Sequence, residues 1–435
     1  MTHHVVFAVE GHPYDPSKSA GDTIVTIPAI GSNVRNVLAR MPRTIPPRAL
    51  DLLDVSIAAY VADRVVERRR AGWDGWQREL ALHVPVREET AWRSAAGDAL
   101  RALAEYLTGD TWHLDVHART AERAYNPRKP LSPFPEVEEV ALFSGGLDSF
   151  AGAIDLLTRG TSGLFVGHRG RNPASGVGSS QRAALNHLKT VHPTAELVSF
   201  FVAEPQKLGA EDSTRSRALL FYALATVTAL GTGARRLTIP ENGYLSLNVP
   251  LSLGHVGSLS TRSTHPHTIA LLRALLAALD LELEVTLPYH HQTKGEVLQG
   301  CLNQPLLHSG LTHTISCGHP SVAGRDPLLP PAYRKPGQHC GYCLACLVRR
   351  ASIEHAFGSD PTFYAYGQPG TFPESRTATL QALRRSLHTQ GAKTDVQRIV
   401  ATGPLEVPPA DLLAFRDVYR RGQDELRTFL ARYGL

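Results

Sequence analysis

Residues 140–150 read Val-Ala-Leu-Phe-Ser-Gly-Gly-Leu-Asp-Ser-Phe, an apolar run followed by a serine, two glycines and a mixed stretch. This order predicts a buried β-strand that ends at Ser144 and a helix that begins near Leu147. Gly145 and Gly146 permit a tight turn and let a ligand approach the backbone. The free amides and the positive dipole end of such a helix form an anion site. A plain glycine turn without a ligand is the alternative.

Three polar side chains of this segment suit a bound phosphate group. The hydroxyls of Ser144 and Ser149 can donate hydrogen bonds to phosphate oxygens. Asp148 would repel a phosphate directly, so we predict that it acts through a magnesium ion. The segment lacks the Gly-Lys-Ser/Thr of a Walker A loop. The predicted phosphate-binding residues are Ser144, Gly145, Gly146, Leu147, Asp148 and Ser149.

Apolar segments and helical patterns alternate on the C-terminal side of this loop. Strands are predicted at 163–167, 196–202, 236–239, 282–287 and 312–316. The spacing indicates parallel βαβ units and a doubly wound parallel sheet of the α/β class. Such sheets bind ligands at the carboxyl ends of their strands. The candidate substrate residues, near strand ends or helix starts, are His168, Arg215, Glu241 and Asn242. Exposed polar loops, a solvated arginine and an Asn-Gly turn are the alternatives.

Differences in composition along the chain indicate separate domains. All four tryptophans lie within the first 112 residues, and residues 126–135 contain four prolines, as a linker would. The pattern predicts an N-terminal α+β accessory domain over residues 1–130, a domain with the phosphate loop over 131–360 and a helical extension over 361–435. The Arg68-Arg-Arg70 run is expected at a solvated helix end.

The overall composition excludes several classes of protein. The chain has 435 residues, of which 43% are hydrophobic and 20% charged, so it can bury large cores and is not disordered throughout. Lys and Arg number 45 against 40 Asp and Glu, a net charge of +5 that permits an anionic ligand but does not indicate nucleic acid. No apolar run approaches the ~18 residues of a membrane span, and the first residues do not resemble a signal peptide. We expect a cytoplasmic location.

All five cysteines fall between residues 301 and 346. Three of them form two Cys-x-x-Cys steps that share a residue, in Cys340-Gly-Tyr-Cys343-Leu-Ala-Cys346. In a cytosolic chain, clustered cysteines indicate metal ligands before disulfides. An iron–sulfur cluster also takes four cysteines, but nothing in the sequence requires redox chemistry. We therefore predict a structural zinc.

A tetrahedral zinc needs a fourth ligand. Cys317 follows a predicted strand and is the best candidate, with His319 and His339 as alternatives. Cys301 is then left over, and we expect it to be a small buried hydrophobe.

The string Ser-Gly-Gly-Leu-Asp-Ser resembles the signature of the PP-loop, or N-type ATP pyrophosphatase, superfamily. That resemblance implies a Rossmann-like fold that cleaves ATP between its α and β phosphates and adenylates an acceptor. Cys317, the CGYCLAC run, Arg349 and the segment 293–297 (Thr-Lys-Gly-Glu-Val) are similar to the QueC family of 7-cyano-7-deazaguanine synthases. In that family the carboxylate of 7-carboxy-7-deazaguanine is adenylated, aminated to an amide and converted to a nitrile. The residues given catalytic roles in this way are Asp148, Ser144 and Lys294.

The chain also departs from the QueC pattern around His168, Arg215 and Glu241. Its extra N-terminal block, the segment 240–244 (Pro-Glu-Asn-Gly-Tyr) and the helical tail resemble the QueC-like proteins of bacterial anti-phage operons, as in the QatC family of the Qat system. This resemblance implies a role in antiviral defence. It also implies a protein partner from the same operon, whose amine would accept the activated carboxylate.

Taken together, the motifs predict an ATP-dependent ligase or synthase that uses ATP, Mg²⁺, Zn²⁺ and a deazaguanine-type small molecule. We expect no membrane partner and leave a nucleic-acid partner open. One alternative is a tRNA-modifying PP-loop enzyme, which the modest net charge disfavours. The other is a non-catalytic ATP-binding subunit of a defence complex.

Overall fold

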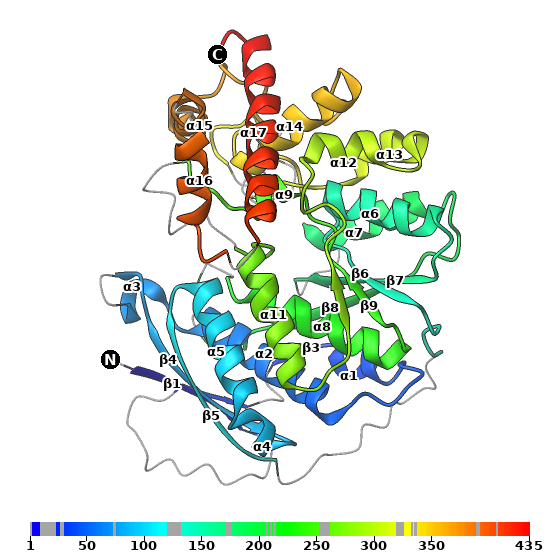
Figure 1. Ribbon diagram of the computed structural model, residues 1–435, viewed down its shortest axis with the longest axis vertical. Coiled ribbons are helices and arrows are strands. Elements are labelled where there is room, and N and C mark those ends of the chain that lie inside the picture. The colour runs from blue at the N-terminus through cyan, green and yellow to red at the C-terminus, as the bar shows by residue number, and fades with distance from the viewer. Residues whose placement is uncertain are drawn as a thin grey trace.

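Two β-sheets form the frame of the molecule, as the computed structural model in Figure 1 shows. The structure describes residues 2–8, 23–26, 30–72, 75–119, 132–170, 176–205, 208, 211, 215–251, 262–318, 326–331, 334, 337–388, 392–405 and 408–435. The larger sheet has the strand order β10-β9-β6-β7-β8-β3, and the smaller sheet has the order β2-β1-β4-β5.

The larger sheet is parallel except at one edge, where β3 is antiparallel to β8. Its strands are β10 (Glu284–Thr286), β9 (Arg236–Thr238), β6 (Glu139–Leu142), β7 (Gly163–Arg169), β8 (Leu197–Ala203) and β3 (Gly31–Ser32). Helices α6 (Leu147–Thr158), α7 (Val177–Leu188), α12 (Lys294–Gly300) and α13 (Gln304–Gly310) cover one face, and α8 (Arg217–Thr232) and α11 (Pro266–Ala278) cover the other. The predicted α/β class with a parallel sheet is confirmed.

The smaller sheet is also parallel, which differs from the α+β arrangement expected for the N-terminal block. Its strands are β2 (Thr23–Thr26), β1 (Thr2–Ala8), β4 (Glu79–Val86) and β5 (Thr111–Ala118). Its helices are α1 (Val34–Leu38), α2 (Pro47–Val65), α3 (Arg68–Ala71), α4 (Glu89–Trp92) and α5 (Ala95–Thr108). Two parallel strands must be joined by a crossover connection, whereas antiparallel strands can be joined by a short hairpin. Helices α2 and α5 serve as such crossovers, so the sheet is parallel.

One hydrophobic core runs through both sheets. Helix α2 packs against α8, and α5 packs against α11. The same cluster of buried side chains includes Leu52 and Leu100 from the N-terminal block and Val166 and Leu224 from the larger sheet and its helices. In addition, β3 belongs by sequence to the N-terminal block but pairs in the larger sheet. The two blocks are therefore packed as one body, and a boundary at residue 130 stays a prediction.

The predicted linker at residues 126–135 is described only from residue 132 onward. There Phe134 is buried beneath the guanidinium of Arg40, which lies 3.7 Å from the ring centroid. The Phe134 amide also donates to the Arg40 carbonyl at 2.8 Å. This end of the linker is consequently fixed to the N-terminal block.

The C-terminal extension adds helices at one end of the molecule (Figure 1). They are α15 (Ala378–His388), α16 (Ala392–Val400) and α17 (Pro409–Arg432), and they follow α14 (Leu344–Phe357), which lies within the predicted 131–360 domain. Helix α17 packs against α14 and against the short helix α9 (Gly243–Ser246), which follows β9. Among the described helices, none combines the length and apolar character that a membrane crossing requires.

Candidate nucleotide site and metal centre

The phosphate loop connects β6 to α6, so the predicted strand and helix are confirmed. Gly145 has a φ of +81°, and a Cβ at this position would lie 3.0 Å from the backbone nitrogen of Gln181. Only glycine adopts this positive φ and allows this close approach of the backbone without strain. The loop is braced by its own hydroxyls, because Ser149 Oγ donates to the Gly146 carbonyl at 2.9 Å and lies 3.2 Å from Ser144 Oγ.

Asp148 lies at the centre of the candidate site, in the first turn of α6, with its side chain 3% exposed. Lys294 Nζ donates to Asp148 Oδ1 at 2.5 Å, and Asn242 Nδ2 donates to Oδ2 at 2.7 Å. Lys294 begins α12 after β10, and Asn242 caps α9 after β9. Because β6, β9 and β10 are neighbours, their carboxyl ends bring these three predicted site residues together.

Two carboxyl groups share this site, and their pKa values are pushed apart. Burial alone would raise the pKa of Asp148, but the charge of Lys294 and the hydrogen bonds from Glu241 and Asn242 lower it below its usual value. Burial and then the negative charge of Asp148 raise the pKa of Glu241 well above its usual value. Of the two carboxyl groups, Asp148 is therefore the one that loses its proton more readily. A divalent cation would relieve this repulsion, so the pair fits Mg²⁺, which prefers carboxylate oxygens.

The helix that carries Lys294 is fixed at its start by a capping box and by the C-terminal extension. Thr293 Oγ1 accepts from the Glu296 amide at 3.1 Å, and Glu296 Oε2 accepts from the Thr293 amide at 2.8 Å. Glu425 of α17 accepts from Thr293 Oγ1 and, at 3.0 Å, from Ser352 Oγ. Sequence reasoning missed Glu425 because no local pattern places α17 beside α12.

An extended segment joins the phosphate loop to the cysteines. We expected a strand at 312–316, but the structure has a 3₁₀ turn, η4 (Leu311–His313), followed by a segment outside the described strands. Ile315 N donates to the Gly145 carbonyl at 2.8 Å, and Ser316 Oγ accepts from the first amide of α6 at 3.4 Å. The segment bonds to the loop because the loop leaves backbone groups there that the sheet does not pair.

The four predicted metal ligands meet at the start of α14. The sulfur atoms of Cys317, Cys340, Cys343 and Cys346 all lie within 4.8 Å of one another. Cys343 caps the helix, Cys346 lies in its first turn, and Cys317 comes from the extended segment. Four sulfur donors so close together could hold a metal such as zinc.

The alternatives for the fourth ligand are not supported. His339 Nε2 accepts a hydrogen bond from the Ser316 amide at 3.1 Å, so this nitrogen is occupied. His319 lies outside the described residues. Cys301 is 4% exposed in an apolar cluster beneath α6 and α12, as expected of a small buried hydrophobe.

Arg349 connects the two halves of the site, a role that the sequence alone did not show. Its side chain is fully buried. Its Nη1 donates to Thr314 Oγ1 at 2.9 Å and to Ser316 Oγ at 3.3 Å, and its Nη2 donates to the Leu311 carbonyl at 2.7 Å. The signals available in the sequence were its place in the resemblance to the QueC family and its position one helical turn after Cys346. Arg349 therefore holds the extended segment against the helix of the metal centre.

The structure places His168 apart from Asp148 and the phosphate loop. Its ring is buried on the α8 side of the larger sheet, where the Val202 amide donates to Nε2 at 3.3 Å and Arg217 Nε lies 3.2 Å from Nδ1. Burial and then the charge of Arg217 lower the pKa of His168 to about 3. No described contact joins His168 to the phosphate loop, and its substrate role stays a prediction.

This buried histidine makes stability depend on pH. Above its ordinary pKa of 6.5 His168 is neutral in both the folded and the unfolded chain, whereas between 6.5 and about 3 only the unfolded chain takes up a proton. We expect the free energy of unfolding to fall as pH decreases through that window, by up to ~1.4 kcal/mol per pH unit from this group. Urea unfolding at pH 7.5, 6 and 5 should show a weaker pH dependence in His168→Gln than in the wild type.

A matched control for this experiment is His113→Gln. The side chain of His113 is 52% exposed on β5, so this variant should keep the wild-type pH dependence. An unchanged slope in His168→Gln would refute the assignment.

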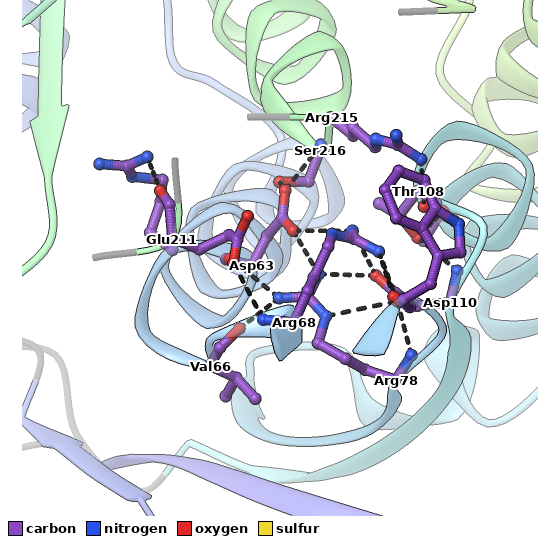
Figure 2. Close-up of polar contacts among 12 residues, drawn as sticks. Asp63, Val66, Arg68, Arg78, Thr108, Asp110, Glu211, Arg215 and Ser216 are labelled. Atoms are coloured by element: carbon purple, nitrogen blue, oxygen red, sulfur yellow. Dashed lines mark hydrogen bonds and ion pairs between the residues drawn. The ribbon is translucent and has the colours of Figure 1, made fainter. Parts of the chain in front are cut away.

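Arg215 lies at the junction of the N-terminal block and α8 (Figure 2). Its Nη1 donates to the Thr108 carbonyl at 3.2 Å, and its guanidinium lies over Trp76, 4.3 Å from the ring centroid. Burial and then the charge of Arg68 lower the pKa of Arg215 to about 10. No described contact joins it to the phosphate loop, and its substrate role also stays a prediction.

Next to Arg215, Figure 2 shows a buried network of four charged side chains. Arg78 Nη2 contacts Asp63 Oδ1 at 2.5 Å and Asp110 Oδ2 at 2.6 Å, and Arg68 Nη2 contacts Asp110 Oδ2 at 2.7 Å. Ser216 Oγ, which precedes α8, donates to Asp63 Oδ2 at 2.8 Å. Arg68 was expected at a solvated helix end and is instead buried, because two buried carboxylates need its charge.

Comparison with known proteins adds no assignment. No family model matches the chain, and a search of curated proteins finds no detectable relative.

Proposed function

We propose that the chain is an ATP-dependent, AMP-forming enzyme of the QueC-like PP-loop type, which adenylates a carboxylate. The observation that carries the proposal is the meeting of Lys294 and Asn242 at Asp148, in the first turn of the helix that follows Ser-Gly-Gly. A lysine and a carboxylate beside a glycine loop at the carboxyl ends of neighbouring strands suit a nucleotide triphosphate.

The residues would act by positioning and by charge neutralisation. The loop amides and the Ser144 and Ser149 hydroxyls would hold the β and γ phosphates. A carboxylate oxygen of the second substrate would attack the α phosphorus, and the bond to the β phosphate would break to release pyrophosphate. Lys294 would offset the negative charge that develops on the leaving pyrophosphate. Asp148 and Glu241 would hold Mg²⁺, which when bound screens the charge of the phosphates.

We further propose that the carboxylate belongs to 7-carboxy-7-deazaguanine and that the protein acts in the cytoplasm in anti-phage defence. The support is the combination of the loop with the cysteine cluster and with an N-terminal block that shares the core of the larger sheet. The product would be an amide, a nitrile or a conjugate with the amine of a partner protein from the same operon. Zinc at the four cysteines would be structural, because all four ligand positions are filled by protein.

The identity of the nucleotide product tests the proposal. The purified protein is incubated with ATP, Mg²⁺ and 7-carboxy-7-deazaguanine, with and without ammonium and each neighbouring gene product. AMP and pyrophosphate are expected, and mass spectrometry of the partners should show the mass of an acyl-deazaguanine if a protein amine is the acceptor. ADP with phosphate would reject the mechanism. Free nitrile with every partner unmodified would reject conjugation alone.

A further inference from the structure

A cavity of about 480 Å³ lies at the carboxyl edge of the smaller sheet. Its lining includes Phe7 near the end of β1, Pro85 near the end of β4, Arg87 directly after β4 and Arg119 directly after β5. These strands are parallel, so their carboxyl ends meet at one edge of the sheet. The volume of the cavity lies within the ~300–1,000 Å³ typical of small-molecule sites.

The strand order gives a reason for a ligand site at this place. In the order β2-β1-β4-β5, β2 lies on one side of β1, whereas β4 and then β5 lie on the other side. The direction in which strands are added therefore reverses between β1 and β4. Open parallel sheets bind ligands at such a reversal, in the crevice outside the carboxyl ends of the strands. Phe7 from β1 and Val84 from β4 line the cavity from the two sides of this point.

Part of the lining is apolar and incompletely covered. It includes four apolar side chains that lie against the main core but are only partly buried, namely Ile30, Leu38, Leu50 and Ile57. A hydrocarbon body would remove their remaining apolar surface from water, which is favourable. The uncharged polar side chains of the described lining are limited to Ser32 and Thr44. The hydroxyls and ring nitrogens of a nucleotide need more polar partners than these two side chains provide.

The charged side chains of the lining are mainly basic. Among the described lining residues, Asp54 is the only carboxylate, and the four guanidinium groups are those of Arg35, Arg43, Arg87 and Arg119. Asp54 Oδ2 accepts from Arg87 Nη1 at 2.8 Å and from Arg119 Nη1 at 2.6 Å, so this one negative charge serves two arginines. An anionic group on a ligand is therefore favoured over a cationic one.

Two of these arginines can bind such an anionic group. Arg87 is held by a second carboxylate, the buried Asp51, at 2.9 Å. Arg35, in contrast, is exposed on α1, and no described carboxylate pairs with it. Arg43 contacts Glu136 at 2.5 Å, but both side chains are more than half exposed, and surface ion pairs of this kind contribute little. A guanidinium group matches a carboxylate with two parallel hydrogen bonds.

We propose that this cavity binds a small carboxylate with a hydrocarbon body, of the kind that a medium-chain fatty acid provides. The hydrocarbon would cover the partly buried apolar side chains, and the carboxylate would bond to Arg35 and Arg43. The inference is independent of the function proposed above, because no described residue of the lining belongs to the phosphate loop or to the metal centre. Ser32 of β3 pairs with Val202 of β8, so the cavity touches strands of both sheets.

Calorimetric titration of the full chain with decanoate, decyltrimethylammonium and acetate tests the inference, below the concentrations at which the amphiphiles form micelles. Decanoate should bind, whereas the cation with a similar chain and the anion without a chain should bind about tenfold more weakly or less. Arg35→Glu reverses the charge of the exposed guanidinium, and Ile57→Trp fills the cavity from α2. Each variant should weaken decanoate binding by about tenfold or more. Decanoate should also raise the thermal midpoint of unfolding more in the wild type than in Arg35→Glu.

Arg69→Glu is the matched control, because Arg69 is exposed on α3 outside the cavity lining and the change of charge is the same. It should bind decanoate as the wild type does. If Ile57→Trp does not fold, Arg35→Glu decides alone, because it replaces an exposed side chain. Wild-type affinity in Arg35→Glu would overturn the inference, as would a wild type that binds decyltrimethylammonium as tightly as decanoate or does not bind decanoate. AMP formation has no part in this test, so its failure would leave the proposed function standing.

Discussion

Asp148→Asn should lower the rate of AMP and pyrophosphate formation by ~10²–10³-fold. The carboxylate is held by Lys294 and Asn242 at the start of α6, where the phosphates and Mg²⁺ would bind. An amide keeps the size of the side chain but removes the charge that a metal ion requires. Quenched-flow analysis of radiolabelled ATP products at saturating ATP measures the effect. An activity within threefold of the wild type would rule out the assigned role.

A double variant separates this loss of activity from a loss of stability. In Asp148→Asn alone the ammonium of Lys294, which is 4% exposed, loses its counterion, and removal of one partner of a buried pair costs ~3–5 kcal/mol. Adding Lys294→Gln removes the stranded charge, so urea unfolding should show that stability partly recovers. Activity should stay as low as in the single variant. Recovery of activity in the double variant would mean that the pair is only structural.

Cys343→Ser should yield protein that lacks the metal and is strongly destabilised. Structural zinc sites contribute ~10–16 kcal/mol to the folding of small domains, and here the four sulfur atoms lie within 4.8 Å of one another. The loss should reach the nucleotide site, because Cys317 continues the segment that bonds to Gly145. Metal analysis by mass spectrometry and the thermal midpoint of unfolding measure both effects.

Cys301→Ser is the matched control. Cys301 is the one cysteine outside the cluster and is buried in an apolar region, so its replacement should cost some stability but leave the metal content unchanged. A full complement of metal and a wild-type midpoint in Cys343→Ser would contradict the metal centre.

The parts of the site that the sequence predicted are those fixed by local patterns. A strand, a glycine turn and a helix start follow one another within residues 140–150, and the spacing of the three cysteines alone indicates a shared metal. Asn242 could be placed because it follows a strand of the same sheet, and Lys294 because the segment 293–297 resembles one of the QueC family. These inferences needed only neighbours in sequence or the common polarity of parallel strands.

The placements that the sequence did not reveal share a physical cause. His168 also lies near the end of a strand, but its ring packs toward α8 and not toward the phosphate loop. The sequence does not show which side chains lie next to the end of a strand. Arg215 donates to the backbone carbonyl of Thr108, and Arg68 pairs with the Asp110 carboxylate, and both partners are far away in sequence. Segment 312–316 has a strand-like composition but bonds to a loop. In each case a partner that is distant in sequence decides where the side chain or segment lies, and a single sequence does not reveal that partner.

The packing of α2 on α8 and of α5 on α11 has a consequence for synthesis on the ribosome. When residue 118 leaves the exit tunnel, the apolar faces of α2 and α5 still lack the helices that cover them, and the last of these ends at residue 278. At ~5–20 residues per second the nascent chain waits roughly 10–30 s with those faces uncovered. Rapid translation and chaperones that bind exposed apolar segments should therefore raise the yield of native protein. Rare codons placed between residues 120 and 270 should lower it.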